Sequence, residues 1–70
     1  SLLETIIVLA NDELVNLFLL KKINFTDITF YLLKLLNMSE FKKYQNMKPG
    51  NVRSIVSLNK HIRTKINKMI

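Results

Sequence analysis

Apolar residues recur every three or four positions through residues 3–20, and this spacing limits the fold more than any other feature. Such spacing is typical of a helix that buries one face, so we predict a first helix over residues 3–20. The residues expected on its buried face are Leu3, Ile6, Ile7, Ala10, Leu14, Leu17 and Phe18. Four further apolar residues widen this face, namely Leu9, Val15, Leu19 and Leu20. We therefore expect more than one neighbour to pack on this helix.

A second helix is predicted over residues 27–37. Thr26 is the expected N-cap, because its hydroxyl can accept a hydrogen bond from an amide that the helix leaves unpaired. Asp27 then lies in the first turn, where negative charge is favoured. Asn37 is expected to end the helix, because asparagine tolerates the left-handed conformation. The inward face is expected to contain Ile28, Tyr31, Leu32, Leu35 and Leu36.

A tight elbow at Ile23–Asp27 is expected to fold these two helices back on each other. Phe25 and Phe30 have a spacing that suggests a hydrophobic staple, which would fix the angle at which the chain enters the second helix. This interpretation requires Phe25 to be buried. A solvent-exposed Phe25 would contradict the predicted architecture.

A third helix is predicted over residues 51–69, after a polar connection from Ser39 to Pro49. Phe41, Tyr44 and Met47 are expected to hold that connection against the core. Asn59 lies in the middle of the apolar stripe of the third helix. A buried amide without partners costs about 1–3 kcal/mol, so we expect Asn59 to bond to another helix or a backbone carbonyl. The stripe comprises Val52, Ile55, Val56, Ile62, Ile66, Met69 and Ile70.

The composition agrees with an all-α fold. A chain of 70 residues with one Gly and one Pro has few turn-forming residues, which favours helices over a sandwich or barrel. We therefore predict one helical domain over residues 1–70, a small bundle of three main helices. The chain has no cysteine and hence no disulfide or thiolate metal site. Polar residues interrupt the first helix, so we do not expect it to span a membrane.

No residue pattern in the chain predicts catalysis. Asp12 and Glu13 are adjacent, so on a helix they point about 100° apart and are expected to form a solvated face, not an acid–base pair or metal site. His61 has no ligand-type partner at suitable spacing and is expected to be exposed or to lie at the rim of the fold. Ser54 and Ser57 lack the context of a nucleophile. We therefore predict no catalytic, cofactor-binding or metal-binding residue in this chain.

Charge is divided unevenly along the chain. All five acids lie between Glu4 and Glu40, whereas eight of the eleven Lys and Arg residues lie between Lys42 and Lys68. A nucleic-acid patch is one interpretation, because clustered cations release phosphate counterions. A solvated helix face is favoured, because the cations surround the polar side of one helix without interleaved aromatic residues. The residues concerned are Arg53, Lys60, His61, Arg63, Lys65 and Lys68.

The turn at Lys48–Asn51 leads into the third helix. An anion could bind at the positive end of the helix dipole there, although a plain cap is the favoured interpretation.

Two groups of residues resemble the C-terminal helical domain of 1-deoxy-D-xylulose 5-phosphate reductoisomerase. The first group matches without a gap: Ala10, Asn11, Asp12, Glu13, Val15, Phe18, Leu19, Ile23, Phe25, Asp27 and Ile28. The second, weaker group is Val52, Ile55, Val56, Leu58, Asn59 and Arg63. The chain departs from the family pattern where Asp12 replaces a glutamate and where Asn59 replaces an aspartate that could pair with Arg63.

The resemblance implies a C-terminal fragment of a longer, homodimeric enzyme, in which this domain supports the catalytic domain and belongs to a four-helix bundle. Such enzymes use NADPH and a divalent metal, Mg or Mn, to convert 1-deoxy-D-xylulose 5-phosphate to 2-C-methyl-D-erythritol 4-phosphate in non-mevalonate isoprenoid biosynthesis. The groups that bind cofactor and substrate lie in other domains. A bacterial cytoplasm or a plastid would be the compartment. The alternative is a small basic helical module that binds nucleic acid or an acidic protein.

Overall fold

The computed structural model describes residues 2–46 and 52–70, without the side chains of residues 45–46 and 52–54. Its helices are α1 (Leu2–Leu19), α2 (Phe25–Leu36), α3 (Ser39–Lys42), a 3-10 turn η1 (Lys43–Asn46) and α4 (Val52–Met69). The described ranges contain no strand, so the predicted all-α fold is confirmed. The long helices begin and end within two residues of the predicted positions.

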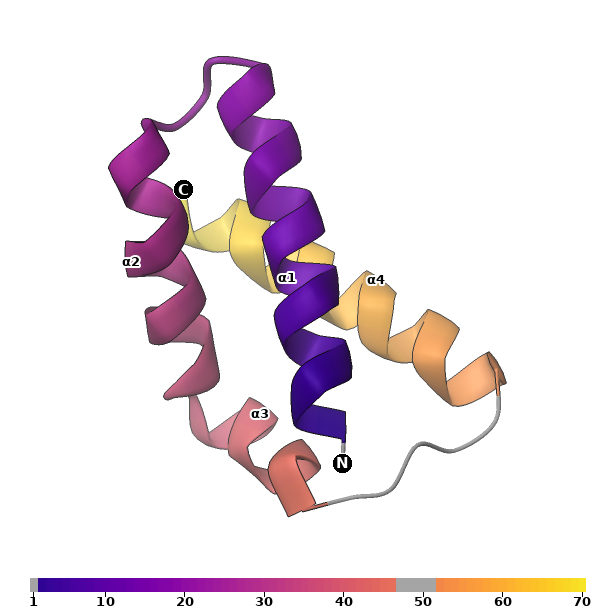
Figure 1. Ribbon diagram of the computed structural model, residues 1–70. Coiled ribbons are helices and arrows are strands. Elements are labelled where there is room, and N and C mark those ends of the chain that lie inside the picture. The colour runs from indigo at the N-terminus through magenta and orange to yellow at the C-terminus, as the bar shows by residue number, and fades with distance from the viewer. Residues whose placement is uncertain (1, 47–51) are drawn as a thin grey trace.

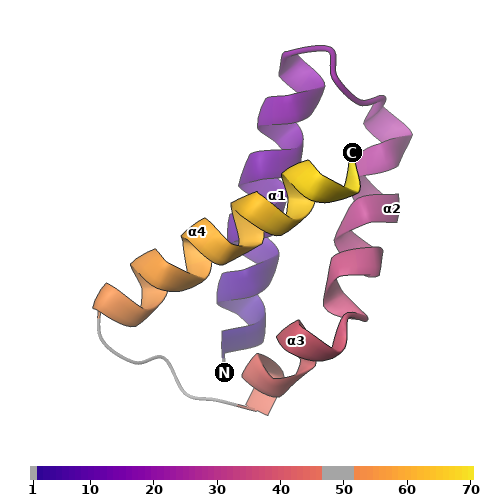
Figure 2. The same ribbon diagram turned by 180° about the vertical axis from the view of Figure 1, so that it is seen from behind.

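Helix α1 lies at the centre of the fold. Helices α1 and α2 run side by side in opposite directions, joined by the elbow at one end (Figure 1). Helix α4 crosses α1 obliquely on the other side, as the view from behind shows (Figure 2). Since α2, α4 and η1 all contact α1, the prediction that more than one neighbour packs on it is confirmed.

The core forms where α1, α2 and α4 meet. Its buried apolar residues are Leu2, Ile6, Ala10, Leu14, Leu17, Ile23, Leu35, Phe41, Leu58, Ile62 and Ile66. On α1 the predicted face is correct at most positions, although Leu3 and Ile7 are only half-buried, and Leu19 and Leu20 are exposed.

The connection after α2 contains two helical turns, where we predicted only a polar loop. Phe41 of α3 is completely buried and Tyr44 packs against the core, so both hold the connection as predicted. Met47 lies outside the described residues. Burying a whole Phe side chain is worth about 1.5–3 kcal/mol, which explains how a four-residue helix stays attached to the bundle.

The first half of the elbow is a C-terminal cap of α1. Lys21 has a φ of 62°, the left-handed conformation that ends many helices. The N–H of Lys22 donates to the Leu17 carbonyl at 2.9 Å, and that of Lys21 donates to the Phe18 carbonyl at 2.9 Å. This pair of bonds is the Schellman motif, and it turns the chain towards α2.

The second half of the elbow is an N-terminal cap of α2. The N-cap is Asn24, so the prediction of Thr26 is wrong. The Asp27 carboxylate accepts a hydrogen bond from the Asn24 N–H at 2.8 Å, which satisfies an amide at the helix start. Because the helix begins two residues early, the staple positions are held by Ile23 and Ile28, and both pack on the core.

Phe25 is 71% exposed, which contradicts the prediction that it is buried. Its ring contacts Phe18 edge-on, with 5.7 Å between the ring centroids. The elbow nevertheless forms, because the two caps and buried Ile23 hold it without the predicted staple.

Asn37 ends α2 as predicted, but it does not adopt the left-handed conformation. Its φ of −89° and ψ of −4° are right-handed. Its side-chain amide donates to the Leu33 carbonyl at 2.9 Å, and this bond satisfies a carbonyl at the helix end.

Helix α4 presents a slightly different face from the predicted one. Leu58, Ile62 and Ile66 are buried, whereas Val56 and Ile70 are exposed. Asn59 is only half-buried, and within the described residues its side chain has no hydrogen bond to another helix or to a backbone carbonyl. The predicted inward amide is therefore wrong at Asn59. The side chain of Val52 lies outside the described residues.

Candidate functional site

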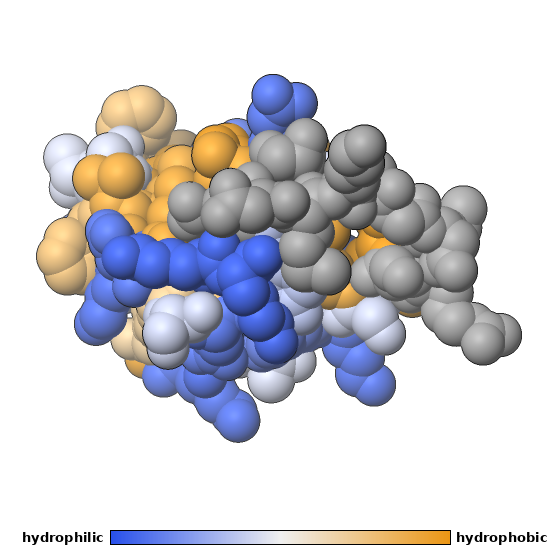
Figure 3. All heavy atoms as spheres, turned by 90° about the horizontal axis from the view of Figure 1, so that it is seen from below, coloured by the Kyte–Doolittle hydropathy of each residue, from blue (hydrophilic) through white to orange (hydrophobic). Residues whose placement is uncertain are grey.

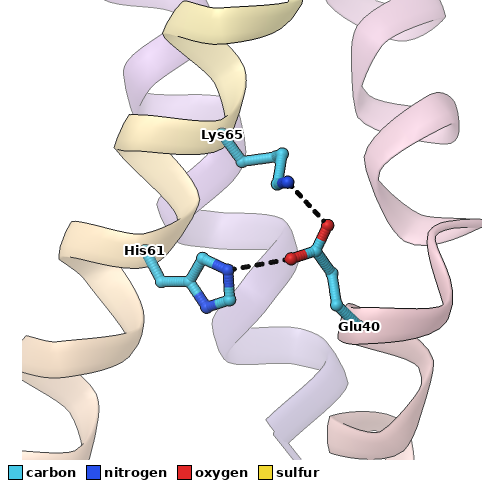
Figure 4. Close-up of polar contacts among 3 residues, drawn as sticks. All are labelled: Glu40, His61 and Lys65. Carbon is cyan, nitrogen blue, oxygen red and sulfur yellow. Dashed lines mark hydrogen bonds and ion pairs between the residues drawn. The ribbon is translucent and has the colours of Figure 1, made fainter.

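Two polar clusters join α4 to the rest of the bundle, and they are the main candidates for a site. The first cluster lies between α3 and α4 (Figure 4). One Glu40 oxygen lies 3.0 Å from His61 Nε2, and the other lies 2.9 Å from Lys65 Nζ. Since His61 and Lys65 are four residues apart, they lie on the same face of α4 and reach the same carboxylate.

The environment of Glu40 favours its ionised form. The hydrogen bond from Lys65 lowers the pKa of the Glu40 carboxyl from its usual value. Desolvation opposes this effect, and the hydrogen bond from His61 adds to it. The cluster is at the rim, with all three side chains partly exposed. It therefore fastens α3 to α4 as a surface ion pair, a type of contact that water and salt weaken.

The second cluster lies between α1 and α4 and contains a buried carboxylate. Glu13 is only 7% exposed. Asn67 Nδ2 donates to Glu13 Oε2 at 2.7 Å, and Arg63 Nε lies 4.0 Å from Glu13 Oε1. The amide of Asn67 also donates to the Arg63 carbonyl at 2.8 Å.

The prediction that Glu13 belongs to a solvated face is wrong. Glu13 follows Ala10 by three residues and precedes Leu17 by four, so it lies on the buried stripe of α1. Its spacing alone was the signal that sequence reasoning missed. Asp12 is exposed, as predicted. The two acids point in different directions and do not form an acid–base pair.

The remaining candidates from the sequence are His61, Ser57, Ser54 and the turn at Lys48–Asn51. His61 lies at the rim, as predicted, although Glu40 is a carboxylate partner that the sequence spacing did not reveal. Ser57 is exposed. The side chain of Ser54 and the turn at Lys48–Asn51 lie outside the described residues. Within the described ranges no group of three His, Cys, Asp or Glu residues could hold a metal ion.

The basic residues of α4 form a partly neutralised face. Lys60 and Lys68 are exposed, whereas Lys65 pairs with Glu40 and Arg63 approaches Glu13. The side chain of Arg53 lies outside the described residues. Cations that are already paired with acids of the same chain gain less from phosphate contacts, so this arrangement favours the solvated face.

A shallow hollow on α1 is lined by Glu4, Thr5, Val8 and Leu9, all from two turns of one helix. Such an open surface does not enclose a ligand. No helix in the described part of the chain is both long and apolar enough to cross a membrane.

Comparison with known proteins identifies the family. Residues 1–65 match the family described as DXP reductoisomerase C-terminal domain. The 1-deoxy-D-xylulose 5-phosphate reductoisomerase of Pelagibacter ubique (strain HTCC1062) is 52% identical over 69 residues, which cover 99% of this chain. The chain spans 18% of the length of that relative. No solved structure matches the chain. The resemblance inferred from the sequence is thereby confirmed, and the chain belongs to the DXP reductoisomerase C-terminal domain family.

Proposed function

We propose that this chain is the structural C-terminal domain of an enzyme that converts 1-deoxy-D-xylulose 5-phosphate to 2-C-methyl-D-erythritol 4-phosphate, a step of isoprenoid biosynthesis. The observation that supports this most is the alignment of nearly the whole chain with a reductoisomerase at 52% identity. The alternative of an independent basic module has no comparable support. In this proposal residues 1–70 form one helical domain that packs on the catalytic domain of a homodimeric enzyme.

The exposed apolar surface is consistent with a supporting role. Large apolar side chains on or next to three helices are exposed in the described residues, a pattern that often marks a contact surface. They are Val8, Leu19, Leu20, Phe25, Phe30, Leu33, Val56 and Ile70. In a larger protein, contact with another domain would bury part of this surface.

The family implies NADPH and a divalent metal, and the described residues do not provide a fitting set of ligands for the metal. The polar clusters around Glu13 and Glu40 consist of groups that already bond to one another. In this proposal both cofactors bind to other domains of the enzyme, as the family resemblance implies.

A domain exchange tests the proposal. The 69 aligned residues of the Pelagibacter enzyme would be replaced by this chain, and oxidation of NADPH would be measured with 1-deoxy-D-xylulose 5-phosphate as substrate. We expect the chimera to retain activity. A matched chimera with Phe41→Ala should lose activity, because Phe41 is the completely buried anchor of α3. A chimera that folds, as judged by circular dichroism, but has no activity would contradict the proposal.

A further inference from the structure

His61 of α4 makes two contacts with α3. Its Nε2 lies 3.0 Å from a Glu40 oxygen, and the centroid of its ring lies 4.9 Å from that of Phe41. Within the described residues the backbones of α3 and α4 do not come close to each other, so side chains alone join the two helices. The polar part of this junction depends on one carboxylate, one histidine and one lysine.

Both contacts of His61 become stronger when its ring gains a proton. A charged donor makes a stronger hydrogen bond to a carboxylate than a neutral donor does. A cation within about 6 Å of an aromatic centroid is attracted to the face of that ring, which adds to the contact with Phe41. Lys65 opposes the added charge, but the Glu40 carboxylate lies between the two groups (Figure 4).

No other charged group pairs with His61 in the described part of the chain. The acid of α1 that faces α4 is Glu13, which approaches Arg63. Lys34 of α2 lies over an aromatic ring of its own helix, and Lys43 of η1 lies over a ring of its own turn. The charge balance at His61 is therefore set within the cluster that Figure 4 shows.

We propose that His61 makes the attachment of α3 to α4 sensitive to pH, and that this attachment is tighter when the imidazole ring is protonated. A histidine ordinarily gains its proton between about pH 8 and 5. The side chains of the cluster are partly exposed, and the end of the bundle at which α3 lies presents hydrophilic side chains to solvent (Figure 3). Solvent protons therefore reach the cluster. This inference does not depend on the proposed function.

The expected pH dependence has two limbs of opposite sign. Stability that comes from protonated His61 is present at mildly acidic pH and is lost as the pH rises and the ring loses its proton. The lowered pKa of Glu40 keeps its carboxylate ionised while His61 gains its proton. At still lower pH Glu40 is protonated as well, and its ion pairs are lost. The attachment is therefore tightest between the two titrations.

The composition of the chain isolates the titration of His61. The chain has one histidine and no cysteine, and the ordinary pKa values of the other side chains lie outside the range from about pH 5.5 to 7.5. His61→Gln removes this titration and keeps that of the N-terminal amine. The net charge of +6 makes an added proton unfavourable overall, so a gain in stability on acidification has to come from a local contact.

Thermal unfolding followed by circular dichroism tests the proposal. We expect the melting temperature of the wild type to rise by about 2–4 °C from pH 7.5 to 5.5. His61→Gln should show no rise, and Glu40→Gln should lose most of it. Lys60→Gln is the matched control and should keep the rise, because it removes an exposed cation of α4 outside the cluster. A wild type without the rise, or an equal rise in Glu40→Gln, would overturn the proposal.

Hydrogen exchange shows whether the gain is local to α3. The N–H groups of Phe41 and Lys42 donate to the Met38 carbonyl at 3.0 and 3.1 Å, so their protection reports the opening of α3. After correction for the intrinsic pH dependence of exchange, we expect their protection factors to rise about two- to fivefold on the same acidification. The Asn37 amide, which donates to the Leu33 carbonyl at 3.1 Å in α2, should change less. Equal changes at all three amides would contradict a contact that acts on α3.

Discussion

Glu13→Ala removes the buried carboxylate that joins α1 to α4, and we expect it to lower the free energy of unfolding by about 1–2 kcal/mol. The lost contact is the 2.7 Å hydrogen bond from Asn67, which is strengthened by the negative charge on its acceptor. Asn67 keeps its bond to the Arg63 carbonyl at 2.8 Å, so no buried donor is left without a partner. The free-energy cost of Glu13→Ala should therefore stay below the upper end of the range of about 1–3 kcal/mol that is usual when a buried polar group loses its partner.

The ion pair adds little to this value. Arg63 Nε lies 4.0 Å from Glu13, and the arginine side chain is largely exposed, so the pair contributes at most about 0.2–1 kcal/mol. Glu13→Gln retains an acceptor for Asn67 and loses only the charge. It is the matched control, and we expect it to cost about 0.5 kcal/mol.

Thermal unfolding followed by circular dichroism measures both effects. For a domain of this size, 1 kcal/mol shifts the melting temperature by about 4–8 °C. A double-mutant cycle with Asn67→Ala should give a coupling energy of about 1 kcal/mol, because the two side chains share one hydrogen bond. If Glu13→Ala melts at the wild-type temperature, or if the two substitutions are additive, the inferred link between α1 and α4 is refuted.

Burial and charge give three further predictions. Phe41→Ala should cost about 3–5 kcal/mol, measured by urea unfolding, because the side chain is completely buried. Phe25→Ala should cost about 1 kcal/mol or less in the same assay, since its ring is exposed and contacts Phe18 edge-on. The lowered pKa of Glu40 means that its carboxylate stabilises the fold at pH values above the ordinary pKa of a glutamate, and this contribution is lost as the pH falls through the lower folded-state pKa. Acidification should therefore lower the melting temperature of the wild type more than that of Glu40→Gln.

The sequence predicted the helices well because their apolar spacing is long and regular. The spacing from Ile6 to Leu17 covers three turns of α1, and the spacing from Leu58 to Ile66 covers two turns of α4. Phe41 was also recognised as an anchor, because a large aromatic residue in a polar segment gains free energy when it is buried. These features depend on local periodicity, which a single sequence contains.

The start of α2 was misjudged although the signal was present. Asn24 is followed three residues later by Asp27, which is the spacing of a capping box. Thr26 is followed three residues later by Thr29, whose hydroxyl is a weaker hydrogen-bond acceptor than a carboxylate. Comparing the two candidates by this second residue would have favoured Asn24.

The polar partners across helices were not predictable from spacing alone. Glu13 and Asn67 are 54 residues apart, and Glu40 and His61 are 21 residues apart. Whether they meet depends on the angle and height at which α4 crosses α1, and linear periodicity does not fix either quantity. The same reason explains why Asn59 was expected to face inward. Asn59 is adjacent to buried Leu58, and successive residues of a helix point about 100° apart. The face that buries Leu58 therefore turns Asn59 away from the centre of the core.

The exposure of Phe25 shows that the elbow does not depend on the predicted staple between Phe25 and Phe30. The elbow needs a left-handed residue at the end of α1 and a cap at the start of α2, and Lys21 and Asn24 supply these. Phe25 is therefore not required for the turn. Helix α2 instead has apolar residues on two faces, since Leu35 is buried in the core while Phe30 is exposed on the other side. Exposed apolar residues on a helix often mark a contact surface, so Phe30 and Leu33 are consistent with contacts beyond the bundle itself.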